Sequence, residues 1–420
     1  MSKTLYVGID PHQKENVCCF LDQEGNKLIN TFSVANNLEG AKELEDRIDL
    51  IMKEHCFTEL KAATEAVSFL DLHIVDYLAS SKLLAKYLPS IYQFNPKITA
   101  GFKKAYPDKD KTDAIDAFVV ADRLRFGRLP EPYEESQPYF PLKRLTRYRY
   151  HLVSNISREK NYFLTHLFLK YSSFSDVKPF SNVFGKAGIA VITEFFSSDE
   201  LASMDIEELV EFLIKEGKNR FSDPEAVAQK VKQVARESYR IRPALANSVN
   251  LILSSTVENI RALTASLKEI DGAIANELKA FPNTLESVKG LGPVYSAGIF
   301  SEIGNIKRFS SHAKLAKFAG LTWRKSQSGN FAAEETYMTK TGNEYLRYYF
   351  VEAANSLRMH NEEYRLYYES KYKEVPKHQH KRALALTARK LVRLVFALLT
   401  KNRLYQENEA FSKNGVNFSL

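Results

Sequence analysis

The sequence predicts a mixed α/β domain in the first third of the chain, followed by a mainly helical remainder. Short apolar runs, separated by turn residues and then alternating with helical patterns, predict the mixed sheet. After a proline-punctuated stretch at 129–142, strand signals nearly vanish and apolar residues recur at helical spacing. With 420 residues, of which 44% are hydrophobic, the chain has enough apolar material for more than one core, which excludes global disorder.

The first domain opens with three predicted strands, at residues 5–9, 16–21 and 28–34. Asn37 can cap the next helix, whose apolar positions 38, 41, 44, 48 and 51 are three or four residues apart. A fourth strand ends at Glu65, a helical pattern follows over 69–78, and a fifth strand covers 91–94. A helix begun by Pro96, a charged loop at 108–111 and a helix over 113–126 complete this predicted unit.

The remainder is predicted to consist of helices in two further domains. Apolar residues recur at helical spacing over 145–167 and again over 253–278, which is typical of an antiparallel helix pair or a coiled coil. The glycine-containing stretch 288–294 separates two helical patterns and is typical of a helix-hairpin-helix-like element that faces phosphate. The predicted domains are therefore 1–141, 142–281 and 282–420.

Charge and cysteine content narrow the class of protein. Lys and Arg number 59 against 51 Asp and Glu, a net charge of +8, so a polyanion such as nucleic acid is the expected partner. Cys18, Cys19 and Cys56 are too few for a disulfide framework or a zinc site, which favours a reducing cytoplasm. We find no secretion signal and no membrane span, because charges interrupt the apolar stretch at 383–399.

Basic residues mixed with aromatic ones mark candidate nucleic-acid contacts. One group lies in the stretch 144–150, although an amphipathic dimerisation helix explains that stretch equally well. A second group surrounds Phe309, Phe318 and Trp323, a mixture suited to phosphates and bases. The candidates are Arg144, Arg147, Arg149, Lys307, Arg308, Arg324, Lys325, Lys340 and Arg347.

Four acids stand out by position: Asp10 and Glu65 at strand ends, and Asp113 and Asp116 on one helix. Asp113 and Asp116 are three residues apart, so they share a helix face. Converging carboxylates can hold two Mg²⁺ ions that polarise a phosphodiester, and all four acids fall where a ribonuclease-H-like fold keeps its metal ligands. The alternative is that Asp10 closes a turn, Glu65 caps a helix, and the helical pair is a solvated face.

Serines beside Gly329 form a second candidate site. Ser326 and Ser328 follow the basic, aromatic stretch 323–325. Such serines are commonly turn residues. The functional alternative is a nucleophile whose hydroxyl attacks a DNA phosphate and forms a phosphoserine ester, with Arg324, Lys325, Lys340 or Arg347 offsetting the growing charge.

Both ends of the chain resemble the DEDD transposases of the insertion-sequence 110 family, also described as bridge-RNA-guided recombinases. The N-terminal motifs are Gly8-Ile9-Asp10-Pro11-His12, the turn at 22–25, Glu65, and Lys111-Thr112-Asp113-Ala114-Ile115-Asp116-Ala117. The C-terminal motifs are Gly290-Leu291-Gly292, Phe309, the stretch 315–321, Ser328-Gly329, Lys340-Thr341-Gly342-Asn343, Leu346-Arg347 and the stretch 388–391. No motif covers residues 172–251.

The resemblance implies a RuvC-like (ribonuclease H) N-terminal domain whose metal ligands are Asp10, Glu65, Asp113 and Asp116. A coiled-coil region and a C-terminal transposase domain follow, with Ser328 as nucleophile and Ser326 in reserve, because Trp323 replaces a frequent proline. Ser68 also departs from the family, in which glycine is common near that position. Implied partners are donor and target DNA and a structured guide RNA.

The family further implies Mg²⁺ as cofactor and dimers that join into tetramers, with active sites shared between subunits. We expect a nucleoid-associated prokaryotic enzyme. Two alternatives stay open: a RuvC-like junction resolvase that uses metal-activated water, and a non-catalytic RNA- or DNA-binding scaffold.

Overall fold

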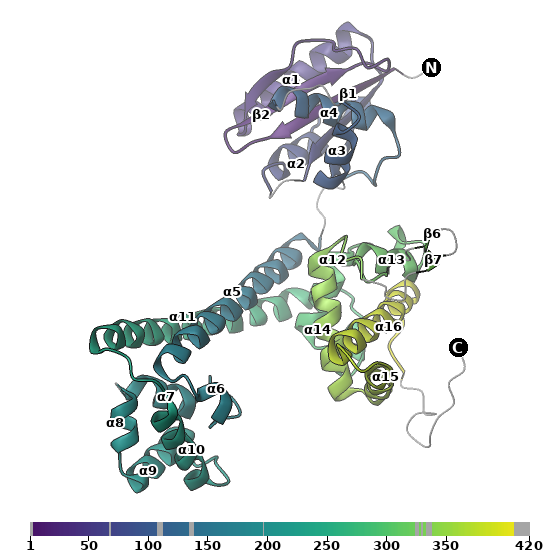
Figure 1. The fold of residues 1–420 in the computed structure, drawn as a ribbon. Coiled ribbons are helices and arrows are strands. Elements are labelled where there is room, and N and C mark those ends of the chain that lie inside the picture. Colours follow the sequence, from purple (N-terminus) through teal and green to yellow (C-terminus); the bar gives the residue numbers. More distant parts are fainter. Residues whose placement is uncertain are drawn as a thin grey trace. The chain divides into compact units, whose positions relative to one another are not determined.

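A computed structural model describes residues 3–66, 69–106, 112–133, 138–195, 197–323, 327–328, 331–332 and 338–406. The chain divides into two compact units, Met1–Pro138 and Tyr139–Leu420 (Figure 1). The first unit is mixed α/β and the second is mostly helical, so the predicted succession of structure types is confirmed. Within the described residues, no helix is both long and apolar enough to cross a membrane.

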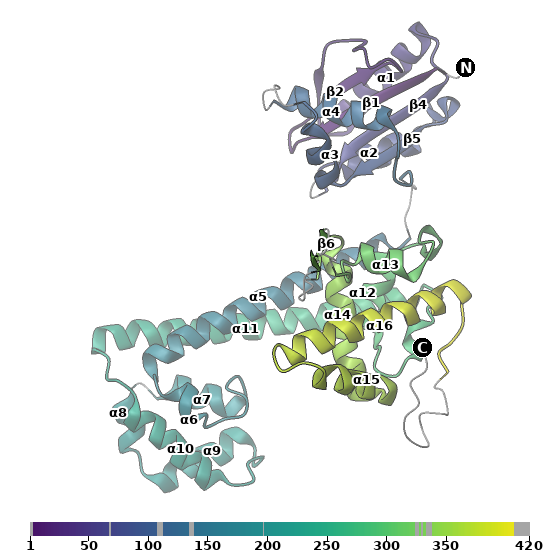
Figure 2. The same ribbon diagram turned by 45° about the vertical axis from the view of Figure 1, so that its right-hand side comes forward.

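A five-stranded sheet organises the first unit, with the strand order β3-β2-β1-β4-β5. Figure 2 labels four of these strands, β2, β1, β4 and β5. The β1–β2 and β2–β3 pairs are antiparallel, whereas the β1–β4 and β4–β5 pairs are parallel. The strands are β1 (Thr4–Pro11), β2 (Glu15–Leu21), β3 (Phe32–Ala35), β4 (Glu59–Glu65) and β5 (Ser90–Phe94). A meander therefore precedes two parallel crossovers, which brings the ends of β1 and β4 to the same edge.

The third strand is shorter than the sequence predicts. The chain makes one isolated bridge between Leu21 and Lys27, leaves the ladder, and rejoins it where Cys18 pairs with Phe32. Leu28 and Ile29 pack against the hydrophobic core instead of extending the strand. These residues are apolar because they contact the core, not because they belong to a strand. The prediction of a strand over 28–34 was therefore wrong for its first half.

Helices cover both faces of the sheet. On one face, α1 (Leu38–Glu54) and α2 (Leu72–Ser80) pack on Leu5, Val7 and Ile9 of β1. On the other face, α4 (Asp113–Phe126) packs on β1, β2 and β4 and also contacts α3 (Pro96–Lys103). The Asn37 side chain accepts a hydrogen bond from the Gly40 amide, so the predicted cap of α1 is confirmed.

Gly8 allows the close contact between β1 and α4. A Cβ at this position would lie 2.2 Å from the Ala117 carbonyl oxygen and 2.4 Å from the Ala121 nitrogen. Only glycine permits this approach. Because side chains alternate along a strand, Asp10 faces the same side as Gly8, toward α4.

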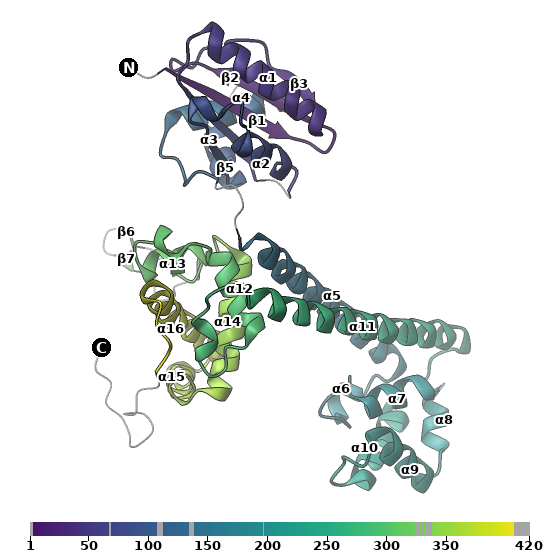
Figure 3. The same ribbon diagram turned by 180° about the vertical axis from the view of Figure 1, so that it is seen from behind.

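Two long helices, α5 (Phe140–Lys170) and α11 (Pro243–Leu278), lie side by side in the second unit (Figure 3). This confirms long helices where the periodicity predicts them; a coiled coil stays a prediction. Their contact includes the Arg149–Asp271 ion pair, in which Nε and Oδ1 are 2.6 Å apart.

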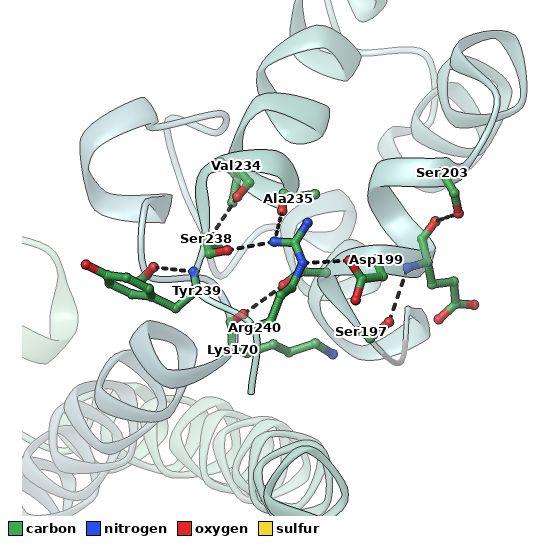
Figure 4. A network of polar contacts seen from close by, with 12 residues as sticks. Lys170, Ser197, Asp199, Ser203, Val234, Ala235, Ser238, Tyr239 and Arg240 are labelled. Atoms are coloured by element: carbon green, nitrogen blue, oxygen red, sulfur yellow. Dashed lines mark hydrogen bonds and ion pairs between the residues drawn. The ribbon is translucent and has the colours of Figure 1, made fainter. Parts of the chain in front are cut away.

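The described residues between α5 and α11 form five short helices, which pack as a small bundle around a core that also includes residues of α5 and α11. They are α6 (Phe174–Val177), α7 (Lys186–Glu194), α8 (Ser198–Ser203), α9 (Ile206–Gly217) and α10 (Pro224–Glu237). Lys170 and Arg240 join the bundle to the long helices (Figure 4). The Arg240 guanidinium donates to Asp199 and to the carbonyls of Ala235 and Ser238. This polar junction fixes the two connections between the bundle and the helix pair.

The C-terminal part of the second unit is a helical cluster around a large apolar core. Its helices are α12 (Pro293–Ile303), α13 (His312–Phe318), α14 (Glu344–His360), α15 (Glu362–Lys373) and α16 (Gln379–Lys401). A short 3-10 helix (Leu285–Ser287) and a turn with Gly290 at φ +104° precede α12, at the predicted helix-hairpin-helix-like element. Gly290 packs on α14, so this turn supports the cluster's core.

Candidate active site

Asp10 and Glu65 lie beside each other at the ends of two parallel strands. The register pairs Ile9 of β1 with Thr64 of β4, so the next residue on each strand is one of the two acids. Both side chains are only partly exposed. The crossover topology therefore brings together carboxylates that are 55 positions apart in sequence.

Asp113 and Asp116 lie in the first turn of α4, which Thr112 caps through a hydrogen bond from the Ile115 amide. Acids in the first turn are favoured by the helix dipole, so they also help this helix to begin here. Packing of α4 against Gly8 brings this turn to the β1 end. The Asp113 side chain is 62% exposed, whereas that of Asp116 is 29% exposed, so the two acids differ in access to solvent.

Electrostatics show that the four carboxylates are neighbours. Burial raises the pKa of Asp10 to about 6; His12 opposes this change, whereas Asp116, Asp113 and Glu65 add to it by repulsion. A bound cation would relieve this repulsion, because like charges at short range disfavour the ionised form. The donor set is rich in oxygen, as Mg²⁺ prefers, so these residues fit a divalent metal.

His12 joins the cluster, and we did not identify it as a site residue from the sequence. Its Nε2 atom lies 3.2 Å from Asp10 Oδ2 and 3.6 Å from Asp113 Oδ2, yet it makes no aligned hydrogen bond within the described residues. Ligand atoms of Asp10, His12 and Asp113 all lie within 4.8 Å of one another. The spacing of two residues between Asp10 and His12 was an available signal, because residues i and i+2 of an extended chain share a face.

Lys103 pairs with Asp116, and this partner was also missed. Lys103 is the last residue of α3, and its ammonium contacts Asp116 Oδ1. No sequence pattern links these two residues. The ammonium of Lys103 thus offsets part of the negative charge of Asp116.

Ser328 lies in a small hairpin of the second unit. The strands β6 (Gln327–Ser328) and β7 (Phe331–Ala332) are antiparallel, with Ser328 opposite Phe331. A separate isolated bridge pairs Trp323 with Met338. Ser326, Arg324 and Lys325 lie outside the described residues, so the choice between the two serines stays a prediction.

Some of the predicted basic residues bond to acids or carbonyls of the protein, whereas others are exposed. Arg147 donates to both oxygens of the buried Glu302, at 2.6 and 3.0 Å, and Arg149 pairs with Asp271, so these two guanidiniums join helices. Arg347 donates to the carbonyls of Ala319 and Lys340. The exposed members are Arg144, Lys307, Arg308 and Lys340, and Arg308 stacks on Phe309 and Phe318.

Comparison with known proteins gives two family matches. Residues 7–171 match the model of the DEDD transposases of IS110, described as a transposase. Residues 283–369 match the model described as the transposase of the IS116/IS110/IS902 family. The chain belongs to the IS110 transposase family. It is thus a transposase, an enzyme that cleaves and rejoins DNA, and the predicted resemblance is confirmed.

Two curated relatives align along nearly the whole transposase. One is the insertion element IS116 uncharacterized 44.8 kDa protein of Streptomyces clavuligerus, 24% identical over 411 residues, which cover 96% of each chain. The other is the insertion element IS900 uncharacterized 42 kDa protein of Mycobacterium paratuberculosis, 22% identical, covering 96% of this chain and 98% of the relative. Each alignment covers 96% of this chain and so extends beyond the two family matches.

Proposed function

We propose that this transposase excises and inserts its own mobile element under the guidance of a structured RNA. Asp10, Glu65, Asp113 and Asp116 would hold Mg²⁺, and Ser328 would be the nucleophile. The observation that carries the metal site is the convergence of four carboxylates at one sheet edge, where burial and then repulsion among the acids raise the pKa of Asp10.

We propose a ribonuclease-H-like, RuvC-like fold for the first unit. Support comes from the order β3-β2-β1-β4-β5 with a meander followed by two parallel strands, and from acids at the ends of β1 and β4. For the remainder we propose a coiled-coil region at 142–281 and a transposase domain at 282–420, since the second family match begins at residue 283.

The proposed chemistry is a pair of phosphoryl transfers. Ser328 Oγ would attack a scissile phosphate, so that an Oγ–P bond forms while the bond from phosphorus to the leaving DNA oxygen breaks. The serine proton leaves to a base, and the departing oxygen gains a proton. A DNA hydroxyl would then attack the same phosphorus, so that a new DNA phosphodiester bond forms while the Oγ–P bond breaks and the serine regains its proton. A bound divalent ion would stabilise the entering and leaving oxygens, while the carboxylates of this chain position it.

The serine mechanism is tested by trapping the covalent link. The transposase is incubated with guide RNA, cognate DNA and Mg²⁺, and a denaturation-resistant protein–DNA adduct is sought. We expect the adduct with wild type and its loss in Ser328→Ala. An adduct that survives in both Ser328→Ala and Ser326→Ala would rule out the serine mechanism.

A second candidate, a junction resolvase that uses metal-activated water, is favoured by one observation: the four acids converge within the first unit without Ser328. This mechanism predicts DNA cleavage that persists in Ser328→Ala and is lost in Asp113→Asn. Our proposal predicts loss of cleavage in both variants.

A further inference from the structure

We propose that His12 is a nitrogen ligand of the metal site and shifts its preference toward transition-metal ions such as Mn²⁺. The inference rests on the proposed function, because it concerns the same site. The four metal ligands that the family resemblance implies are all carboxylates. His12 would therefore make this a mixed oxygen and nitrogen site.

The first argument is the position of the imidazole. Nε2 of His12 is buried, points between Asp10 Oδ2 at 3.2 Å and Asp113 Oδ2 at 3.6 Å, and has no aligned hydrogen-bond partner within the described part of the chain. These contacts are not aligned as hydrogen bonds, so they satisfy a buried ring nitrogen poorly. A metal ion held by both carboxylates would give this nitrogen a partner.

The second argument is that the fold holds His12 in place from the other side. Its backbone N–H donates to the Glu15 carbonyl at 2.8 Å, which closes the turn between β1 and β2. The Asn36 side-chain amide donates to the carbonyls of His12, at 2.8 Å, and Leu70, at 3.1 Å. Asn36 thus ties the backbone of His12 to the segment that follows Glu65, so the Cα from which the ring projects is held in place.

The chemical consequence concerns the choice of ion. Carboxylate oxygens suit Mg²⁺ and Mn²⁺, whereas imidazole nitrogen adds affinity for transition metals and little for Mg²⁺. A site of acids with His12 therefore favours Mn²⁺ over Mg²⁺ more strongly than the acids alone.

The test measures Mn²⁺ bound to the full chain by electron paramagnetic resonance, without DNA or turnover. Wild type, His12→Gln and His55→Gln are compared; His55 is an exposed histidine at the end of α1 and serves as the matched control. We expect nitrogen coupling from imidazole in the pulsed spectra of wild type and His55→Gln, and its loss in His12→Gln. The Kd for Mn²⁺ should rise by about tenfold in His12→Gln, the size of effect seen when groups around a metal are removed. The Kd for Mg²⁺, measured by its competition with Mn²⁺, should change less in His12→Gln than the Kd for Mn²⁺.

Every other outcome contradicts either the role of His12 or the metal site as a whole. Bound Mn²⁺ without nitrogen coupling in wild type, or coupling that persists in a folded His12→Gln protein, overturns the role of His12 and leaves the acidic metal site standing. Failure of wild type to bind more Mn²⁺ than the Asp10→Asn/Asp113→Asn variant overturns the metal site itself, and the proposed function with it. Circular dichroism of each variant verifies that it is folded.

Discussion

Arg147 has one role predicted from the sequence and a different one in the structure. From the sequence it is a candidate for DNA contact, whereas the structure places its guanidinium on Glu302, a carboxylate that is also hydrogen-bonded by Asn343. A cation that compensates a buried acid is expensive to remove, because the acid is left without its counter-charge.

We therefore expect Arg147→Met to destabilise the second unit by about 3–5 kcal/mol. The double variant Arg147→Met/Glu302→Gln should lose less than the sum of the two single variants, because the buried charge is gone. Denaturant unfolding of the full chain measures both. Unchanged stability with weakened DNA binding in Arg147→Met would instead support the nucleic-acid role.

Lys170 provides a pH-dependent prediction far from the candidate active site. The residue is buried and donates through Nζ to the carbonyls of Ile192 and Phe195 at 2.7 and 2.5 Å. Burial lowers the pKa of Lys170 from 10.5 to about 8, with Glu200 opposing. Between these two values the unfolded chain binds more protons than the folded chain, so stability rises with pH.

Relative to Lys170→Met, which has no titrating group here, the free energy of unfolding of wild type should increase from pH 8 to 10. The slope is at most about 1.4 kcal/mol per pH unit. Denaturant titrations of both proteins across this range provide the measurement. A difference that stays constant or shrinks would show that the lysine is not held with a lowered pKa.

At the scale of elements, the contact of β1 with α4 positions the acids. Gly8→Ala would place a methyl group against the Ala117 carbonyl and the Ala121 amide, so the helix must move away from the strand. We expect a loss of about 1–3 kcal/mol in stability, typical of overpacking, together with weaker Mn²⁺ binding because Asp113 and Asp116 move with α4.

Gly101→Ala is the matched control for this prediction. It lies in α3, and a Cβ there meets nothing within 4 Å. Alanine should leave stability equal or raise it by up to about 1 kcal/mol. Equal effects of the two substitutions on thermal unfolding and Mn²⁺ binding would contradict the assigned role of the β1–α4 contact.

At the scale of the whole molecule, the candidate acids and the candidate serine belong to different compact units. The family resemblance implies active sites shared between subunits. If the acids of one subunit act with Ser328 of another, two inactive variants can complement each other.

We expect a mixture of Asp113→Asn and Ser328→Ala proteins to regain adduct formation on cognate DNA. A mixture of Asp113→Asn with Asp10→Asn, which damages the same unit twice, should stay inactive. If the first mixture forms mixed oligomers yet yields no adduct, the acids and the serine must act within one subunit.

The sequence by itself determined the types and order of the elements, because helical and strand periodicity are local properties of a buried face. It also placed Asp10 and Glu65 at strand ends and the two aspartates on one helix turn, and its motifs identified the family. Only the tertiary structure decided that Leu28 and Ile29 leave the ladder, that Arg147 and Arg149 pair with acids, and that His12 and Lys103 join the acidic cluster. These outcomes depend on contacts between residues far apart in the chain, and local periodicity does not encode which side chains the topology brings together.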